Sequence, residues 1–204
     1  MTDISQIIIR SPLKYNHPSP TFTTPPLEWL QHTWSVTHST LPMWKKAKNV
    51  RITYKIIPPT SPHAAPLLDD EVTSTPTSKT WMPQPKSIQG IDTPDGDGAW
   101  NWRGKGWLKI ASSHWEVLGW GERDITEGPH KGEKERWVVT WFAPSLFTPQ
   151  GLDIYSSRKE GLSEGTYKEV KKALEEMEAG DLGELVKGIC LRLRLSIKGI
   201  KLRL

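Results

Sequence analysis

Tryptophan is the residue type whose abundance first suggests a chemical role for this chain. The 204 residues include eleven tryptophans but only three phenylalanines. Because an indole combines a large apolar face with one N–H donor, clustered tryptophans can line a pocket for an apolar ligand. Packing in an ordinary core is the simpler explanation for most of them. The residues that we expect to bind a ligand in such a pocket are Trp44, Tyr54, Trp102, Arg103, Trp107, Trp115 and Trp141.

Five polar side chains on or beside the same segments could act on a bound molecule. One or two such groups inside an apolar cavity suffice to polarise a carbonyl or to move a proton. A surface position or a structural hydrogen bond is the alternative role for each of them. The candidate catalytic residues are His38, Arg51, His114, Asp153 and Tyr155.

Arg51 shows how the direction of a strand face decides between these roles. It lies opposite an apolar face that is formed by Val50, Ile52 and Tyr54. Successive side chains of a strand point to opposite sides. Arg51 therefore points into the interior if the apolar face packs outward under a helix, and into solvent if it does not.

No motif for a metal or cofactor accompanies these residues. The six histidines form no His-x-x-x-His pair, and none lies beside the single cysteine, Cys190. The nucleophile elbow, the P-loop and the dinucleotide fingerprint are absent as well. We therefore expect a site without a metal and without a cofactor.

The basic charge of the chain is concentrated at one end. The net charge is +4, but residues 187–204 contain six basic residues and no acidic one. The remainder has 21 basic and 23 acidic residues. A nucleic-acid-binding domain usually carries basic surface on its folded body, so we expect no nucleic-acid partner.

Cysteine usage and hydropathy indicate the compartment. One cysteine allows no disulfide within the chain, and the apolar run Ile7–Ile9 is too short for the core of a signal peptide. No segment approaches the roughly 20 apolar residues that a membrane helix needs. These features predict a cytoplasmic protein without a transmembrane segment, and they leave its oligomeric state open.

Alternation of apolar and polar residues predicts eight or nine short strands. The clearest alternation covers residues 48–57, and TPDGDG at 93–98 is typical of a turn. Leu27–Leu30 fits a short helical turn before the first strand. The predicted strands are 34–39, 48–57, 67–75, 86–93, 99–103, 106–112, 114–121, 136–143 and 151–157.

The sequence changes to a helical pattern after the last predicted strand. Thr166 and Glu169 have the spacing of a capping box, Val170 begins an apolar stripe, and Gly180 suits a helix end. These signals predict one amphipathic helix at about 166–179. The expected fold class is all-β: an antiparallel up-and-down β-barrel of about eight to nine strands with one C-terminal amphipathic helix.

The chain is therefore expected to have three parts. Residues 1–26 form a proline-rich N-terminal leader, and residues 27–186 form the barrel with its helix. Residues 187–204 form a basic tail in which Leu and Ile alternate with Arg, Ser and Lys. This tail fits a membrane-surface or partner strand, an ordinary terminal strand, or a disordered or non-native extension.

Three sequence blocks resemble a known family. The pattern EWLQHTW, with Trp34 early in the first strand, resembles the Gly-x-Trp signature of lipocalins and related calycins, although His32 stands in place of the glycine. The blocks LPMWKKAKNVRITY and WRGKGWLKIASSHWEVLGWGE are similar to small lipocalin-like proteins of filamentous fungi. The resemblance covers about 27–180. It implies a cavity for a hydrophobic ligand, with Trp34 packing at the closed end, and it implies no catalytic motif.

Several functions are compatible with this resemblance. The barrel could bind a hydrophobic small molecule, such as a secondary metabolite or its precursor. It could instead be a cofactor-independent isomerase or cyclase, similar to a pericyclase, that acts on a polyketide or terpenoid intermediate, because similar domains occur in fungal biosynthetic cyclases. Some related barrels bind haem through one histidine, for which His114 or His130 is the candidate. A barrel filled by its own side chains is the remaining alternative.

Overall fold

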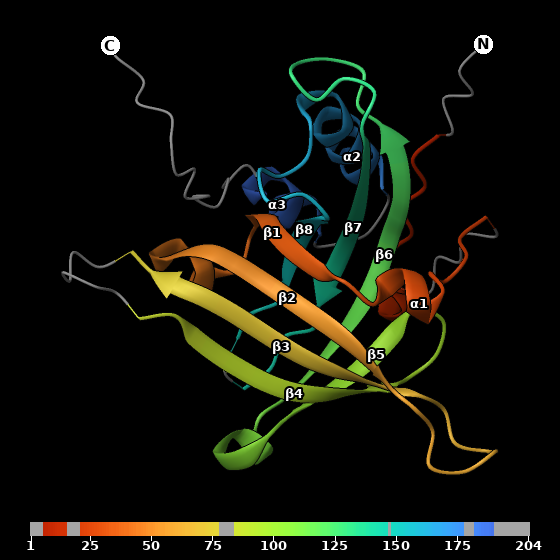
Figure 1. The fold of residues 1–204 in the computed structure, drawn as a ribbon, viewed down its shortest axis with the longest axis vertical. Coiled ribbons are helices and arrows are strands. Elements are labelled where there is room, and N and C mark those ends of the chain that lie inside the picture. Colours follow the sequence, from red (N-terminus) through yellow and green to blue (C-terminus); the bar gives the residue numbers. More distant parts are fainter. Residues whose placement is uncertain (1–5, 16–20, 78–83, 147, 178–181, 190–204) are drawn as a thin grey trace.

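Eight strands form one closed antiparallel barrel (Figure 1). The computed structural model describes residues 6–15, 21–77, 84–146, 148–177 and 182–189. Each strand pairs with its neighbours in sequence, and β1 also pairs with β8, which closes the ring. This confirms the predicted fold class. The strands are β1 (Thr33–Ser39), β2 (Ala47–Ile57), β3 (Leu67–Pro76), β4 (Lys86–Pro94), β5 (Ala99–Gly104), β6 (Ser112–Asp124), β7 (Lys134–Phe142) and β8 (Gly151–Ser156).

Strand β2 shows how the alternation in the sequence determines the interior of the barrel. Val50, Ile52 and Tyr54 are buried in the hydrophobic cluster that fills part of the barrel. On the neighbouring strand β3, Asp70 lies opposite Tyr54, so the inner face carries a carboxyl group as well. Since neighbouring side chains point to opposite sides, Arg51 lies on the outer face.

Two β-bulges shift this alternation elsewhere. In β1 the pairing with β8 changes register between Val36 and His38, so that Ser39 lies opposite Asp153. In β6 the register changes between Val117 and Gly119. An extra residue in one strand reverses the face on which the following side chains lie. The bulge in β1 therefore places His38 outside the barrel and Ser39 inside it.

The strand predicted at 106–112 is wrong for most of its length. Residues Gly106–Ile110 form a 3-10 helix, η3, between β5 and β6. Gly106 has a φ of 59°, a value that glycine adopts without strain and that interrupts an extended backbone. A Cβ at Gly104 would lie only 2.4 Å from the backbone oxygen of Leu108, so the chain can fold back here only because residue 104 is glycine.

Two helices cover the outer faces of β7 and β8 (Figure 1). Helix α2 (Glu164–Glu176) begins two residues before the predicted start, because Ser163 rather than Thr166 caps it. Helix α3 (Leu182–Gly188) follows it. The apolar residues that pack beneath the helices include Trp137, Val139, Trp141, Leu152 and Ile154. A second, separate core therefore lies outside the barrel.

Trp34 lies at one end of the barrel, beside the short helix α1 (Leu27–Leu30). Its side chain is fully buried, and its indole N–H donates a hydrogen bond of 2.9 Å to the backbone oxygen of Leu30. The ring of Trp29 lies 5.3 Å from that of Trp34 and 4.6 Å from that of Trp120. These indoles fill this end of the barrel.

The N-terminal segment contacts the outside of β6. The backbone N–H of Arg10 donates a hydrogen bond of 2.8 Å to the backbone oxygen of Leu118. Its guanidinium forms a buried ion pair of 2.6 Å with Glu116. Part of the predicted leader therefore packs along the barrel wall.

The end of the basic tail, residues 190–204, lies outside the described residues. Among the helices that the structure describes, none is long and apolar enough to cross a membrane.

Candidate functional site

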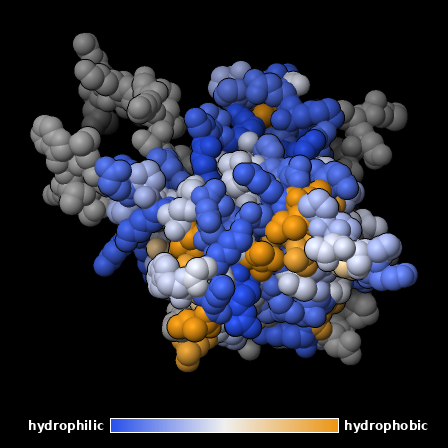
Figure 2. Space-filling model, turned by 60° about the horizontal axis from the view of Figure 1, so that its bottom comes forward, coloured by the Kyte–Doolittle hydropathy of each residue, from blue (hydrophilic) through white to orange (hydrophobic). Residues whose placement is uncertain are grey.

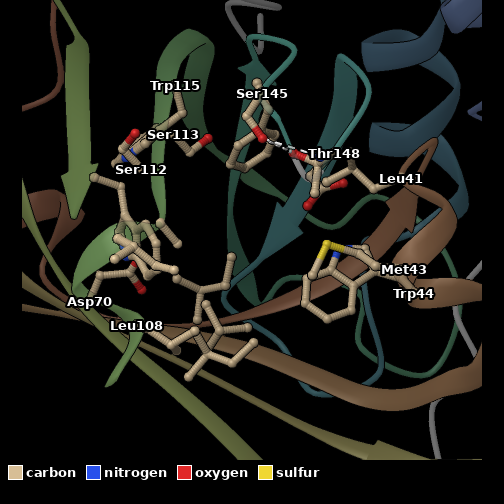
Figure 3. Close-up of a pocket in the computed structure, with 18 of the residues that line it drawn as sticks. Leu41, Met43, Trp44, Asp70, Leu108, Ser112, Ser113, Trp115, Ser145 and Thr148 are labelled. Carbon is tan, nitrogen blue, oxygen red and sulfur yellow. Dashed lines mark hydrogen bonds between the residues drawn. The ribbon is translucent and has the colours of Figure 1, made fainter. Parts of the chain in front are cut away.

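A cavity of about 420 Å³ lies inside the barrel. It opens to the surface between three segments. One is η2 (Pro42–Lys46), which follows β1, and the others are η3 and the connection between β7 and β8. Figure 3 shows Met43 and Trp44 on one side of this space and Asp70 and Leu108 on the other. The lining residues are Leu41, Met43, Trp44, Ile52, Tyr54, Asp70, Val72, Ile88, Trp102, Trp107, Leu108, Ile110, Ala111, Ser112, Ser113, Trp115, Phe142, Ser145, Thr148 and Asp153.

The lining is largely apolar and aromatic, but two carboxyl groups interrupt it. Asp70 and Asp153 are the acidic residues of this lining, and none of its described residues is a lysine, arginine or histidine. Ser145 and Thr148, at the rim, hydrogen-bond to each other through their hydroxyl groups at 2.9 Å. The carboxyl groups therefore dominate the electrostatics of the cavity.

Asp153 is the most deeply buried of the lining acids, with 1% of its surface exposed. The Ser39 hydroxyl donates a hydrogen bond of 2.5 Å to Oδ1, while Oδ2 has no hydrogen-bond partner among the described residues. Burial raises the pKa of Asp153 to about 7, against the opposing effects of the Ser39 hydroxyl and the nearby Trp44 N–H. A substantial share of Asp153 is therefore neutral at physiological pH.

Asp70, the other lining acid, lies on β3, and Asp92 places a third carboxyl group inside the barrel on the neighbouring strand β4. Asp70 is 6% exposed and its Oδ1 has no hydrogen-bond partner in the described structure. Burial, and then the charge of Asp92, raise the pKa of Asp70 well above its ordinary value. Burial likewise raises the pKa of Asp92 to about 7, although the Trp115 N–H donates a hydrogen bond of 2.8 Å to its Oδ1.

Two tyrosines lie among these acids. Tyr54 stacks on Trp115 with 5.4 Å between ring centroids, and Trp115 in turn stacks on Trp100 at 6.0 Å. Tyr155 is fully buried on β8, two residues after Asp153. Burial raises the pKa of both tyrosine hydroxyls well above the ordinary value, so both are neutral hydrogen-bonding groups.

The structure brings seven of the twelve predicted site residues together. Six of them line the cavity: Trp44, Tyr54, Trp102, Trp107, Trp115 and Asp153. Tyr155 is buried in the same interior cluster without lining the cavity. Their roles toward a ligand remain predictions.

The other five predicted residues lie outside the barrel. The ring of His38 stacks on that of Tyr167 in α2 at 4.0 Å, as the bulge in β1 requires. Arg51 lies on the outer face of β2 because the apolar face packs inward. Trp141 is buried beneath the helices.

Arg103 and His114 lie on the outer side of the same barrel end. They help to line a second, open depression of about 740 Å³. The Nδ1 atom of His114 lies 3.0 Å from the side-chain oxygen of Asn101.

Neither histidine that was a candidate haem ligand reaches the cavity. His114 faces the outer depression, and His130 lies in the turn between β6 and β7. No histidine in the part of the chain that the structure describes lines the cavity. The described residues also contain no group of three or more potential metal-binding side chains. The described part of the cavity therefore offers no histidine to a haem iron.

Sequence reasoning missed Asp70 and Asp92. Asp70 has a signal that could have identified it, because it alternates with Leu68 and Val72. Asp69 is adjacent to it, however, and points to the other side of the strand, where it pairs with Lys105 at 2.7 Å. The register of β3, in which Asp70 lies opposite Tyr54, shows that Asp70 is the one inside.

Comparison with known proteins finds distant likeness among solved structures. No family model and no curated protein matches the chain. Among solved structures, the chain is similar to lobster apocrustacyanin A1, with 10% sequence identity, coverage of 85% of this chain and 86% of that one, and a TM-score of 0.46. A likeness at this level carries no conclusion about family or ligand.

Proposed function

We propose that this barrel binds an apolar small molecule in the cavity between η2 and η3. The observation that carries the proposal is the cavity itself, which is lined mainly by aromatic and aliphatic side chains and contains two buried carboxyl groups. Binding sites for small molecules have this composition: apolar walls that supply affinity, and a few polar groups that fix orientation.

The size of the cavity argues against a barrel that its own side chains fill. A single water molecule needs roughly 10–15 Å³ of such space. The cavity offers about 420 Å³. Protein interiors are normally packed with few voids larger than a water molecule, so the side chains of the barrel do not fill it.

The rim of the cavity offers an apolar route for a ligand. Trp107 is 86% exposed, Ile110 82% and Met43 45%, and all three line the opening. Figure 2 turns this end of the molecule forward and shows hydrophobic surface interrupting a largely hydrophilic face. Exposed apolar groups around a concave site support its use for binding.

Titration with the uncharged fluorophore Nile red tests this proposal. Ile88 lines the cavity from β4, whereas Ile91 lies on the same strand and faces outward. The variant Ile88→Trp is expected to fill the cavity and to weaken Nile red binding at least tenfold. The matched variant Ile91→Trp is expected to bind like the wild type. Equal binding by all three proteins would place the dye elsewhere and overturn the proposal.

A second candidate function is that of a cofactor-independent isomerase or cyclase. Asp153 supports it, because a carboxyl group with a pKa of about 7 in an apolar cavity can both donate and accept a proton near neutral pH. Candidate polyketide or terpenoid intermediates would be incubated with the protein and analysed by mass spectrometry. A product that forms with the wild type but not with Asp153→Asn supports catalysis. Recovery of unchanged ligand supports binding alone.

A further inference from the structure

We propose that the ligand is an amphiphilic amine whose protonated nitrogen is held by Asp70 and Asp153, while its apolar part lies against the aromatic lining. This inference rests on the proposed function and specifies the ligand class for the same cavity. Three features of the site support it.

The first feature is the sign of the charge in the cavity. The lining has two carboxyl groups, Asp70 and Asp153, and no basic side chain among its described residues. A ligand carboxylate would find no counter-charge there and would face two acids. An ammonium group would find two acceptors, because a buried charge is favourable only when it is paired and hydrogen-bonded.

The second feature is the unsatisfied hydrogen-bonding capacity of the same two residues. Oδ1 of Asp70 and Oδ2 of Asp153 are buried and lack a hydrogen-bond partner in the described structure. Buried polar atoms in proteins are nearly always hydrogen-bonded, and an ammonium group has three donors to offer. Both residues are more than nine-tenths buried, and both belong to the lining of the cavity.

The third feature is the aromatic wall beside the carboxyl groups. Trp44, Tyr54 and Trp115 line the cavity together with Asp70 and Asp153. The face of an aromatic ring attracts a cation, and tryptophan does so most strongly. Carboxylates and indole rings around one space therefore recognise the two parts of an amphiphilic amine, its charge and its apolar body.

Burial of these acids couples amine binding to proton release. Burial raises the pKa of both lining carboxyl groups, so in the free protein each is protonated to a greater extent than an exposed carboxyl group at the same pH. An ammonium group favours the ionised carboxylate and displaces such a proton. The other titratable groups that act on Asp70 or Asp153, or lie beside them in the barrel, are Tyr54, Asp69, Glu71, Asp92, Lys105 and Tyr155.

Three ligands with one alkyl chain and different head groups provide the test. Decylamine, decanol and decanoate would each be titrated into the wild-type protein by calorimetry at a pH of about 7.5, where the amine is protonated. We expect decylamine to bind at least about tenfold more tightly than decanol, and decanoate to bind most weakly. Repeating the decylamine titration in buffers of different ionisation enthalpy should reveal proton release, which decanol should not cause.

Carboxyl variants assign this preference to the two residues. The double variant Asp70→Asn/Asp153→Asn is expected to still bind decanol but to lose the preference for decylamine over decanol. Asp124→Asn removes a carboxyl group from the exposed end of β6, and it should change neither affinity. Retained decanol binding shows that the double variant is folded with its cavity intact. Should the double variant not fold, proton release by the wild type still decides the matter.

The possible outcomes separate the two proposals. If none of the three ligands binds, the proposed function itself fails. If decanol or decanoate binds as tightly as decylamine, or if decylamine binds without releasing protons, the cavity is a binding site but the amine inference is overturned. The same conclusion follows if the double variant keeps its preference for decylamine.

Discussion

The Trp115 indole N–H donates a hydrogen bond of 2.8 Å to Oδ1 of Asp92, and this bond joins β6 to β4 across the interior of the barrel. Both side chains are almost fully buried. Oδ1 of Asp92 thus has a hydrogen-bond partner, whereas its other oxygen, Oδ2, has none in the described structure. It also holds Trp115 as part of the cavity wall.

Replacing Trp115 by phenylalanine should destabilise the protein more at pH 8 than at pH 5. The loss of this hydrogen bond leaves a buried acceptor unsatisfied, which costs about 1–3 kcal/mol. Because the bond lowers the pKa of Asp92 toward about 7, its removal raises that pKa and penalises the ionised form in particular. Urea unfolding at both pH values measures the difference. Trp107→Phe, at an exposed position, is the control, and equal losses at both pH values would contradict this account.

Asp153→Asn should stabilise the protein at alkaline pH. The pKa of Asp153 is about 7 in the folded state against an ordinary value of 3.8. The folded state therefore binds the proton more tightly, and its stability falls as the pH rises from about 4 to about 7, by up to about 4 kcal/mol. Asparagine keeps the acceptor for Ser39 but cannot ionise.

The free energy of unfolding of Asp153→Asn should thus exceed that of the wild type at pH 8 and approach it near pH 4. The surface variant Asp124→Asn should show no such trend. A parallel pH dependence of the wild type and Asp153→Asn would mean that the carboxyl group titrates normally in the fold.

Gly90→Ala should disturb the cavity wall through Trp102. A Cβ at Gly90 would lie 2.1 Å from the indole Nε1 of Trp102, so the ring must move. Overpacking of this kind typically costs about 1–3 kcal/mol. We expect a lower melting temperature and weaker Nile red binding, because Trp102 lines the cavity. Gly183→Ala, where a Cβ would meet no neighbour within 4 Å, is the control. Unchanged dye binding by Gly90→Ala would show that Trp102 does not shape the site.

Arg10→Met should destabilise the protein by about 3–5 kcal/mol, because it leaves Glu116 buried without its cation. The pair is 2.6 Å apart, and its two side chains are 5% and 1% exposed. Lys168→Met breaks an exposed pair within α2 and should cost less than about 0.5 kcal/mol. Thermal unfolding compares the two variants. Similar small losses would mean that the N-terminal segment contributes little to the stability of the barrel.

The barrel could be predicted from sequence where the pattern is local. The alternation of Val50, Ile52 and Tyr54 is a property of one strand, and it determines both the strand and its buried face. The region after Gly104 was predicted as a strand because the residues around Trp107 are apolar. The structure instead has η3 there, with Trp107 exposed.

The candidate site depends on pairing between strands, which the sequence does not state. Whether His38 faces inward depends on a bulge that appears only in the register between β1 and β8. The alternation of Asp70 with Leu68 and Val72 favours Asp70 over Asp69 as the inward residue, and the register of β3 opposite Tyr54 confirms it. Among the aromatic residues, Trp102 and Trp115 were placed correctly at the cavity, whereas Trp141 was not, because the outer face of β7 under the helices is apolar as well.

Fluorine NMR of protein labelled with 5-fluorotryptophan tests the central claim most directly, because it reports where a ligand binds. Signals would be assigned with single Trp→Phe variants and followed during titration with decylamine. Binding in the cavity should shift the signals of Trp44, Trp102 and Trp115, which line it. The signals of Trp137 and Trp141, which lie beneath the helices outside the barrel, should remain unchanged. Saturable shifts confined to Trp137 and Trp141 would contradict a ligand site inside the barrel.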